Sequence, residues 1–245
     1  MSELSGMVAI VTGSSSGIGE RTAQRLAELG AHVVVNSASS VEAGEKLAAS
    51  LPNGAIYIQA DISDKAQCEK LINGTIAKFG KLDLLVNNAG WTTLVPHGDL
   101  EALTDEIFER TFEVNVFGTW QLTKMAMPHL LKSEDGNVVN ITSVAGVRPM
   151  GSSIAYSMTK AALNQMTVLL AKSCGPVRVN AVAPGLVETP WTKDWQNQHD
   201  AVKAVTPLHR SATMEDCVQA TLGLLRTKYA TGQIFVVDGG LTLVI

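Results

Sequence analysis

The sequence predicts an α/β fold: a doubly wound, seven-stranded parallel sheet with helices on both faces. Three observations predict it. Short apolar runs alternate with helical stretches along the whole chain. These runs are apolar at nearly every position, as in strands that are buried on both faces. A glycine-rich turn joins the first run to the first helix. Alternation of this kind builds right-handed βαβ units and therefore a parallel sheet.

Seven apolar runs have the length and composition of buried strands. The first, MVAIVT, carries no charged side chain and leads directly into the glycine-rich turn. The last is followed by Asp238-Gly239-Gly240. The predicted strands are Met7–Thr12, His32–Asn36, Ala55–Ala60, Leu82–Asn87, Asn137–Thr142, Val177–Ala183 and Gln233–Asp238.

Six stretches with helical spacing separate these strands. Gly30 is suited to end the first helix, because glycine readily adopts the left-handed conformation at a helix C-terminus. Thr104-Asp105 predicts an N-cap that interrupts the long fourth stretch, and Thr213 with Asp216 approximates a capping box. No linker or repeat divides the chain, so one domain is expected over residues 1–245. The predicted helices are Gly17–Leu29, Val41–Leu51, Asp64–Phe79, Glu101–Leu131, Ile154–Ser173 and Ala212–Leu225.

Composition excludes several classes of protein. The net charge of −4 comes without a basic run, which argues against nucleic acid as a partner. The apolar runs are too short to span a bilayer, and the N-terminal residues do not resemble a signal peptide. The three cysteines, Cys68, Cys174 and Cys217, are scattered, and the five histidines lack metal-ligand spacing. We therefore expect a cytoplasmic protein without a metal site.

The turn after the first strand, Thr12-Gly13-Ser14-Ser15-Ser16-Gly17-Ile18-Gly19, can bind a phosphate group. Its glycines allow a tight turn and close approach of the backbone to a pyrophosphate. The N-terminus of the following helix adds free N–H groups and a positive dipole end. An ordinary glycine-rich turn is the alternative, but the strand–turn–helix context favours a dinucleotide-binding Rossmann fold.

The T-G-x3-G-x-G spacing resembles the short-chain dehydrogenase/reductase family, and within it the 3-oxoacyl-[acyl-carrier-protein] reductases. Later segments match the same family in order, each at the corresponding strand end, from about Leu4 to the C-terminus. They are Asn87-Asn88-Ala89-Gly90, Asn115, Ser143, the pair Tyr156-x3-Lys160, Pro184-Gly185 with Thr189, and Asp238-Gly239-Gly240.

Tyr156 and Lys160 lie four residues apart and share one helix face. Alone, such a pair is usually a solvated helix face. A tyrosine has a pKa of roughly 10, which a neighbouring ammonium group would lower. The resemblance implies that Tyr156 is the catalytic acid/base and that Ser143 binds the substrate oxygen. It also implies that Lys160 contacts the nicotinamide ribose and lowers the pKa of Tyr156, while Asn115 holds a water molecule.

The resemblance also implies a set of cofactor contacts. For Asp61, a helix-capping role before Asp64 is the structural alternative. The implied residues are Gly13, Ser15, Ser16, Gly17, Ile18 and Gly19 at the pyrophosphate, Asn36 and Ser37 at the end of the second strand, Asp61 and Ile62 at adenine, Asn88, Ala89 and Gly90 at the adenosine ribose, Tyr156 and Lys160 at the nicotinamide ribose, and Pro184, Gly185, Val187 and Thr189 at the carboxamide.

The end of the second strand decides between NADP and NAD. A carboxylate there would bind the ribose 2′-hydroxyl of NAD and repel a 2′-phosphate. The stretch Asn36-Ser37-Ala38-Ser39-Ser40 carries no carboxylate, which favours NADP. It also carries no arginine, and Ser16 stands where many NADP-using relatives have a basic residue. NAD therefore remains an alternative.

Three segments would surround the substrate beyond the strand ends: Trp91–Gly98, Ala145–Ser153 and Glu188–His209. The third resembles the family's substrate lid and carries Trp191 and Trp195, which either face a substrate or pack on a neighbouring subunit. The predicted function is hydride transfer between NADP(H) or NAD(H) and a small ketone or secondary alcohol. The alternatives are a 3-oxoacyl-carrier-protein reductase and, in another class, a non-catalytic cofactor-sensing protein.

A homotetramer is expected from the resemblance and from apolar surfaces. The C-terminal segment Gly239–Ile245 carries no charge. The stretches Glu101–Leu131 and Ile154–Ser173 are apolar over more than one face, as helices covered on both sides are. Two isologous contacts of this kind would close a tetramer. The alternative is that the tail folds back on its own subunit and the helices belong to the core.

Overall fold

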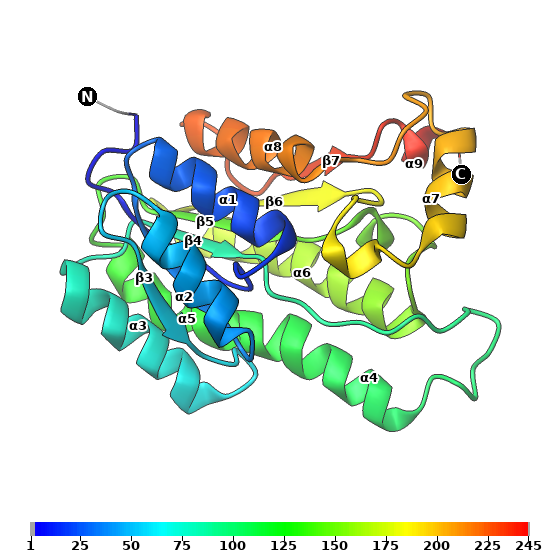
Figure 1. Ribbon diagram of the computed structural model, residues 1–245, viewed down its shortest axis with the longest axis horizontal. Coiled ribbons are helices and arrows are strands. Elements are labelled where there is room, and N and C mark those ends of the chain that lie inside the picture. Colours follow the sequence, from blue (N-terminus) through cyan, green and yellow to red (C-terminus); the bar gives the residue numbers. More distant parts are fainter. Residues whose placement is uncertain (1–2, 245) are drawn as a thin grey trace.

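All seven strands pair in parallel in the order β3-β2-β1-β4-β5-β6-β7, which confirms the predicted sheet (Figure 1). The computed structural model describes residues 3–244. Met1, Ser2 and Ile245, at the ends of the predicted N-terminal and apolar C-terminal segments, lie outside the described residues. The strands are β1 Val8–Val11, β2 His32–Ser37, β3 Ile56–Gln59, β4 Leu84–Asn87, β5 Asn137–Ile141, β6 Arg178–Pro184 and β7 Ile234–Val237.

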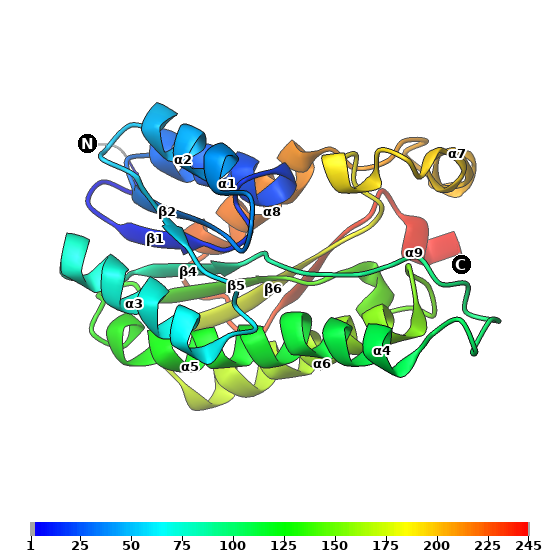
Figure 2. The ribbon, with the colours of Figure 1, turned by 60° about the horizontal axis from the view of Figure 1, so that its bottom comes forward.

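Two helical layers cover the sheet, as Figure 2 shows in side view. On one face lie α1 (Gly17–Glu28), α2 (Val41–Ser50) and α8 (Met214–Arg226). On the other lie α3 (Lys65–Phe79), α4 (Asp105–Phe112), α5 (Thr119–Leu130) and α6 (Ile154–Ser173).

Neighbouring residues of a strand enter different cores. In β1, Ala9 and Val11 pack in the core under α1 and α8, while Val8 and Ile10 pack in the core under α3 and α5. This explains why the strands are apolar at nearly every position, since both faces of the sheet are buried.

The order of the strands reverses between β1 and β4. β2 and β3 extend the sheet to one side of this point, and β5, β6 and β7 extend it to the other. Helices that leave β1 and β4 therefore cover opposite faces, and a crevice opens beyond the carboxyl ends of these strands. Ligands bind at such a point in open α/β sheets.

The predicted helix Glu101–Leu131 is three elements in the structure. It begins at α4, where the Thr104 side chain accepts a hydrogen bond from the N–H of Ile107, as the predicted N-cap requires. A π-helical segment, Glu113–Gly118, then separates α4 from α5. Asn115 lies in this wider turn. A π-helical turn contains one more residue than an α-helical turn, which changes the direction of the side chains around it. Such segments are frequent at functional sites.

Two short helices were missed by the sequence analysis. α7 (Gln196–Val205) follows a 3₁₀ turn, Pro190–Thr192, and α9 (Leu241–Val244) follows β7. In α7 the N-cap residue is Trp195, whose side chain makes no capping hydrogen bond, so the usual start signal is missing. The Thr213–Asp216 capping box at the start of α8 is present, as predicted.

A chain of buried amides crosses the centre of the sheet. Asn87 on β4 pairs in register with Asn140 on β5, and its Nδ2 donates to the Asn140 Oδ1 at 2.9 Å. Asn140 donates in turn to the hydroxyl of Thr167 on α6 at 2.8 Å, and Asn87 donates to Thr123 on α5 at 2.9 Å. The chain thus links two strands to the two helices that cover them.

Within residues 3–244, no helix combines the length and the apolar composition needed to cross a membrane. The same residues hold no group of three or more His, Cys, Asp or Glu side chains placed to bind a metal ion.

Candidate active site

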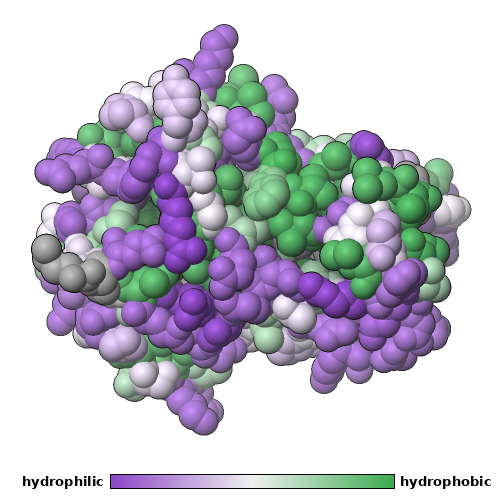
Figure 3. Space-filling model, turned by 90° about the horizontal axis from the view of Figure 1, so that it is seen from above, coloured by the Kyte–Doolittle hydropathy of each residue, from purple (hydrophilic) through white to green (hydrophobic). Residues whose placement is uncertain are grey.

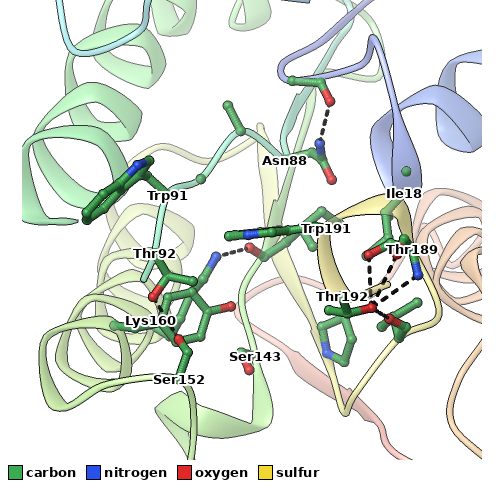
Figure 4. Close-up of a pocket in the computed structure, with 18 of the residues that line it drawn as sticks. Ile18, Asn88, Trp91, Thr92, Ser143, Ser152, Lys160, Thr189, Trp191 and Thr192 are labelled. Carbon is green, nitrogen blue, oxygen red and sulfur yellow. Dashed lines mark hydrogen bonds between the residues drawn. The ribbon is translucent and has the colours of Figure 1, made fainter. Parts of the chain in front are cut away.

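A cavity of about 750 Å³ lies at the carboxyl ends of the strands, where the strand order reverses. Its wall combines the glycine-rich turn, the ends of β2 to β6 and the segment after β6. Figure 4 shows side chains from these separate segments turned toward a common space.

The glycine-rich turn packs too closely for side chains at two positions. Gly13 has a φ of 60°, and a Cβ there would lie 2.9 Å from the Ala89 Cα. A Cβ on Gly19 would lie 2.5 Å from the Gly13 carbonyl oxygen. Asn88 holds the turn in place, because its Nδ2 donates to the carbonyls of Thr12 and Gly13 at 2.9 and 3.1 Å.

The turn ends at the N-terminus of α1, which faces the cavity. Ser16 is the N-cap residue, and its side chain makes no capping hydrogen bond. Ser15, Ser16, Gly17 and Ile18 line the cavity beside it. Backbone N–H groups, hydroxyls and the positive end of the helix dipole therefore converge on one region, so the residues present fit a pyrophosphate group.

Asn36 lines the cavity, but its side-chain amide is hydrogen-bonded to the backbone of the protein itself. It is 1% exposed. Its Nδ2 donates to the carbonyls of Ile58 and Ala60 at 3.1 and 3.0 Å, and its Oδ1 accepts from the N–H of Gly13 at 3.4 Å. The Ser37 hydroxyl is likewise bound to the Ser40 carbonyl and the Tyr57 hydroxyl. The exposed residues at this end of the cavity are Ala38, Ser39 and Ser40.

Asp61 is held by an ion pair that the sequence analysis did not foresee. Its carboxylate accepts from the Arg110 guanidinium at 3.2 Å and from the N–H and hydroxyl of Ser63 at 2.9 and 2.7 Å. Burial opposes ionisation of Asp61, but the bonds from Ser63 and Arg110 outweigh it and lower the pKa. The alternative that Asp61 caps α3 is wrong, because Asp64 is the N-cap residue.

Ser143, Tyr156 and Lys160 meet on one wall of the cavity (Figure 4). Ser143 follows β5, and its hydroxyl accepts from the N–H of Ala145 at 3.1 Å. The Lys160 Nζ is buried, donates to the Ile141 carbonyl at 2.9 Å and lies 5.4 Å from the centroid of the Tyr156 ring. The helical spacing thus brings the two side chains together as predicted.

Burial dominates the proton affinities of this pair. It raises the pKa of Tyr156 to about 12, against a smaller opposite effect of the hydrogen bond with Ser143. It also lowers the pKa of Lys160 to about 8. The net pKa of Tyr156 therefore lies above its ordinary value in this structure, and the predicted lowering effect of Lys160 stays a prediction. The physical reason is desolvation, which disfavours both the phenolate and the ammonium.

Asn115 lies behind the wall rather than on it. Its side chain closes a two-way bridge with the backbone of Trp91, accepting from the N–H at 2.7 Å and donating to the carbonyl at 2.9 Å. It also donates to the Thr159 hydroxyl at 3.0 Å. A Cβ on Gly90 would lie 3.4 Å from the Asn115 Oδ1 and 3.8 Å from the Lys160 Nζ, so both groups flank this glycine.

The predicted lid, Glu188–His209, leaves the fold between two segments that are bonded to each other. The N–H of Glu188 donates to the Ala212 carbonyl, and the N–H of Ala212 donates to the Leu186 carbonyl. Inside the lid, the buried His199 contacts the Thr192 carbonyl and the Ser211 hydroxyl through its two ring nitrogens. Trp191 projects into the cavity from the 3₁₀ turn (Figure 4).

The structure places nearly all the predicted site residues on the cavity wall. Asn115 and Gly19 lie behind it, since Gly19 packs on Asn88. The sequence analysis missed Arg110 of α4, Val114 of the π-helical segment and Leu241 of α9. Arg110 lies four residues before Val114, another wall residue, so a helical face was the available signal.

Comparison with known proteins gives a family match over most of the chain. The family model described as Enoyl-(Acyl carrier protein) reductase matches residues 13–242. A protein of Streptomyces violaceoruber, named as a ketoacyl reductase of the granaticin polyketide synthase, is 53% identical and covers 95% of each chain. A Synechocystis protein named 3-oxoacyl-[acyl-carrier-protein] reductase is 37% identical over 99% of this chain and 100% of its own.

Solved structures agree with this match. The 3-ketoacyl-(acyl-carrier-protein) reductase of Brucella melitensis, solved as a complex with NADH, aligns with a TM-score of 0.91 and 31% identity. The alignment covers 98% of this chain and 100% of the Brucella chain. With its sheet order, its cavity and its relatives in agreement, this chain belongs to the short-chain dehydrogenase/reductase family and is an oxidoreductase.

Proposed function

We propose that this enzyme reduces a ketone to a secondary alcohol, with NADPH as the preferred cofactor and Tyr156 as the proton donor. The observation that supports it is the meeting of Ser143, Tyr156 and Lys160 on the wall of one cavity. With a pKa of about 12, Tyr156 is protonated near neutral pH and therefore holds the proton that this reduction requires.

Each side chain has a proposed role. The Ser143 hydroxyl donates a hydrogen bond to the carbonyl oxygen as negative charge develops there. The phenol of Tyr156 transfers its proton to the same oxygen. Lys160, whose pKa of about 8 lies close to neutral, stabilises the resulting phenolate and helps to restore its proton. Asn115 positions Trp91 and holds a water molecule near Gly90, between itself and Lys160.

The proposed cofactor contacts follow the cavity wall. The pyrophosphate lies at Gly13, Ser15, Ser16, Gly17 and Ile18, and Asp61 and Ile62 contact the adenine. When bound, the nicotinamide supplies the hydride that reduces the carbonyl carbon. Its carboxamide meets Pro184, Gly185, Val187 and Thr189, and its ribose meets Tyr156 and Lys160. Asn88, Ala89 and Gly90 lie along the adenosine ribose.

NADPH is proposed because residues 36–40, at the β2 end of the cavity, offer hydroxyls and no carboxylate. Ser15, Ser16, Ser39 and Ser40 line this end, and Asn36 supports it from behind. Hydroxyl and N–H donors can bind a 2′-phosphate, which a carboxylate at this place would repel. The related Brucella protein was solved with NADH, and the ratio of kcat/KM values for NADPH and NADH tests the preference.

A 3-oxoacyl-carrier-protein reductase is the second candidate, because several relatives carry this name. The test of both is steady-state kinetics with NADPH or NADH and a panel that includes simple ketones and an acetoacetyl thioester. Oxidation of NADPH by at least one of these substrates is the expected result. A purified wild-type protein that oxidises neither nicotinamide with any of them would overturn the proposed function.

We also propose a homotetramer in the cytoplasm. Exposed apolar side chains support the assembly, among them Phe117, Leu169, Phe235 and Leu243. Apolar surface also gathers over the end of the molecule that carries α7 and α9 (right in Figure 3). The three cysteines are unpaired within the described residues, and Cys68 and Cys217 are buried, as expected in a reducing compartment.

A further inference from the structure

The substrate end of the cavity carries no charge of its own. The charged side chains among the described wall residues are Asp61, Arg110 and Lys160. The first two pair with each other at the adenosine end, and Lys160 belongs to the proposed catalytic group. Beyond Ser143 and Tyr156, the polar side chains on the wall are neutral, such as Thr92, Ser152 and Gln198. An anionic substrate would lose its hydration there without gaining a counter-ion.

Tryptophan is concentrated on this part of the wall. The chain has four tryptophans, and Trp91, Trp191 and Trp195 line the cavity. They come from two segments, the loop after β4 and the lid after β6. The indole of Trp191 reaches into the cavity above Lys160 in the view of Figure 4 and is 50% exposed. An exposed indole inside a cavity offers a large flat apolar face to a ligand.

Both segments are fixed by hydrogen bonds. The peptide groups of Trp91 are bonded to Asn115, and the carbonyl of Ser152 accepts from the N–H of Val95 at 2.8 Å. Next to Trp191, the Thr192 hydroxyl donates to the Val187 carbonyl at 2.6 Å. The backbone that carries the two indoles is thus bonded to the π-helical segment, to the loop before α6 and to the segment after β6, and a ligand meets a surface that is already in place.

We propose that the substrate is an uncharged ketone that carries a flat ring system, and that Trp191 determines this specificity by stacking on the ring. This inference rests on the proposed function and adds the chemical class of its substrate. A flat ring gains stacking energy beyond the apolar area that it buries, whereas a puckered ring of similar size gains mainly the area.

The experiment compares benzylacetone with its cyclohexyl analogue, in which the ketone is separated from the ring so that carbonyl reactivity is the same. We expect the wild type to have the higher kcat/KM for benzylacetone. Trp191→Ala should lower this value about tenfold while changing that of the cyclohexyl analogue less than about threefold. Trp191→Phe should keep most of the preference. Trp120→Phe, which changes the tryptophan outside the cavity wall, is the matched control and should change neither value.

Three results would overturn the inference. The first is an equal loss for both ketones in Trp191→Ala. The second is a fall in NADPH affinity of the same size, measured without ketone, which would make Trp191 a cofactor contact. The third is an equal loss for a linear acetoacetyl thioester, which would show that Trp191 serves any acyl chain.

If no ketone is turned over at all, the proposed function fails, and binding decides the inference separately. Quenching of tryptophan fluorescence by naphthol should then saturate in the wild type and in Trp120→Phe. The affinity should fall about tenfold in Trp191→Ala. Absence of binding to the wild type would overturn the inference as well.

Discussion

Tyr156 is a half-buried tyrosine on α6. Tyr156→Phe keeps the ring and removes the proton donor, so kcat should fall at least about a hundredfold, as expected for loss of a general acid. The Kd for NADPH, measured by fluorescence titration, should stay within about twofold, because the ring still fills the same space. Residual turnover above about a tenth of wild type would remove Tyr156 from the proposed role.

Lys160 is a buried cation whose charge is retained at a cost in stability. In the unfolded chain it titrates near 10.5, and in the folded protein near 8. Between these pH values the unfolded chain binds the extra proton, so this side chain makes stability rise with pH in that window. Lys160→Met should therefore raise the free energy of unfolding at pH 7 by roughly 1–3 kcal/mol.

The gain in Lys160→Met should shrink as the pH rises from about 8 past 10.5, above which Lys160 is neutral in both states. Urea denaturation at neutral and alkaline pH measures both effects, and Lys132→Met, which changes an exposed lysine, serves as the control. A variant that is less stable than wild type at pH 7 would show that the bond to the Ile141 carbonyl outweighs the cost of burying the charge.

Cofactor choice is best tested beside Asn36 rather than at it. Asn36→Asp would remove two N–H hydrogen bonds and bury a charge. Its effect on activity would therefore reflect lost stability rather than cofactor choice. Ala38→Asp places a carboxylate at the exposed adenosine end of the cavity. Repulsion of the 2′-phosphate should shift the ratio of kcat/KM values toward NADH about tenfold. Ala49→Asp on α2 adds the same charge away from the cavity and should leave the ratio unchanged, whereas a wild type that prefers NADH would contradict the proposal.

At the scale of elements, the π-helical segment explains how Asn115 reaches the loop after β4. Asn115→Ala would leave the N–H and carbonyl of Trp91 without their partner, while the hydroxyl of Thr159 would keep its bond to the Tyr156 carbonyl. Unsatisfied buried groups cost about 1–3 kcal/mol each, so we expect the free energy of unfolding to fall by at least about 2 kcal/mol. Urea denaturation measures it. Thr119→Ala, a buried polar change one turn away, is the control, and an equal loss there would indicate a general packing effect.

The elements that the sequence predicted well are those with a strong local signal. The sequence predicted β1 and its turn because an apolar run is followed by glycines that residues with a side chain could not replace. The Thr104 N-cap and the Thr213–Asp216 capping box placed the starts of α4 and α8. The π-helical turn was missed because Glu113–Gly118 has an ordinary helical composition, and tertiary bonds from Asn115 stabilise the wider turn. The engagement of Asn36 with β3 was missed because it depends on which strands become neighbours.

For the whole molecule, the assembly prediction changes once the tail is seen. Leu241 is 3% exposed and lines the cavity, so deleting the tail from that residue would damage the site. Leu243 is 83% exposed and is the better probe. We expect sedimentation of the wild type at four times the chain mass of 26.0 kDa. Leu169→Arg and Leu243→Asp should yield smaller species, because a charge in an apolar contact is unpaired. A wild-type monomer would contradict the proposal.

The buried amides of β4 and β5 bear on how the sheet finds its alignment during folding. Most strand positions hold Val, Ile or Leu, which would tolerate a neighbour displaced along the strand. Asn87 and Asn140 do not, because a slip of one residue turns their side chains to opposite faces and leaves their donors in an apolar layer. Their partners on α5 and α6 would lose bonds at the same time. The two asparagines therefore favour the native alignment of the strands. Misaligned sheets, which an entirely aliphatic centre would accept, are destabilised by the unpaired amide groups.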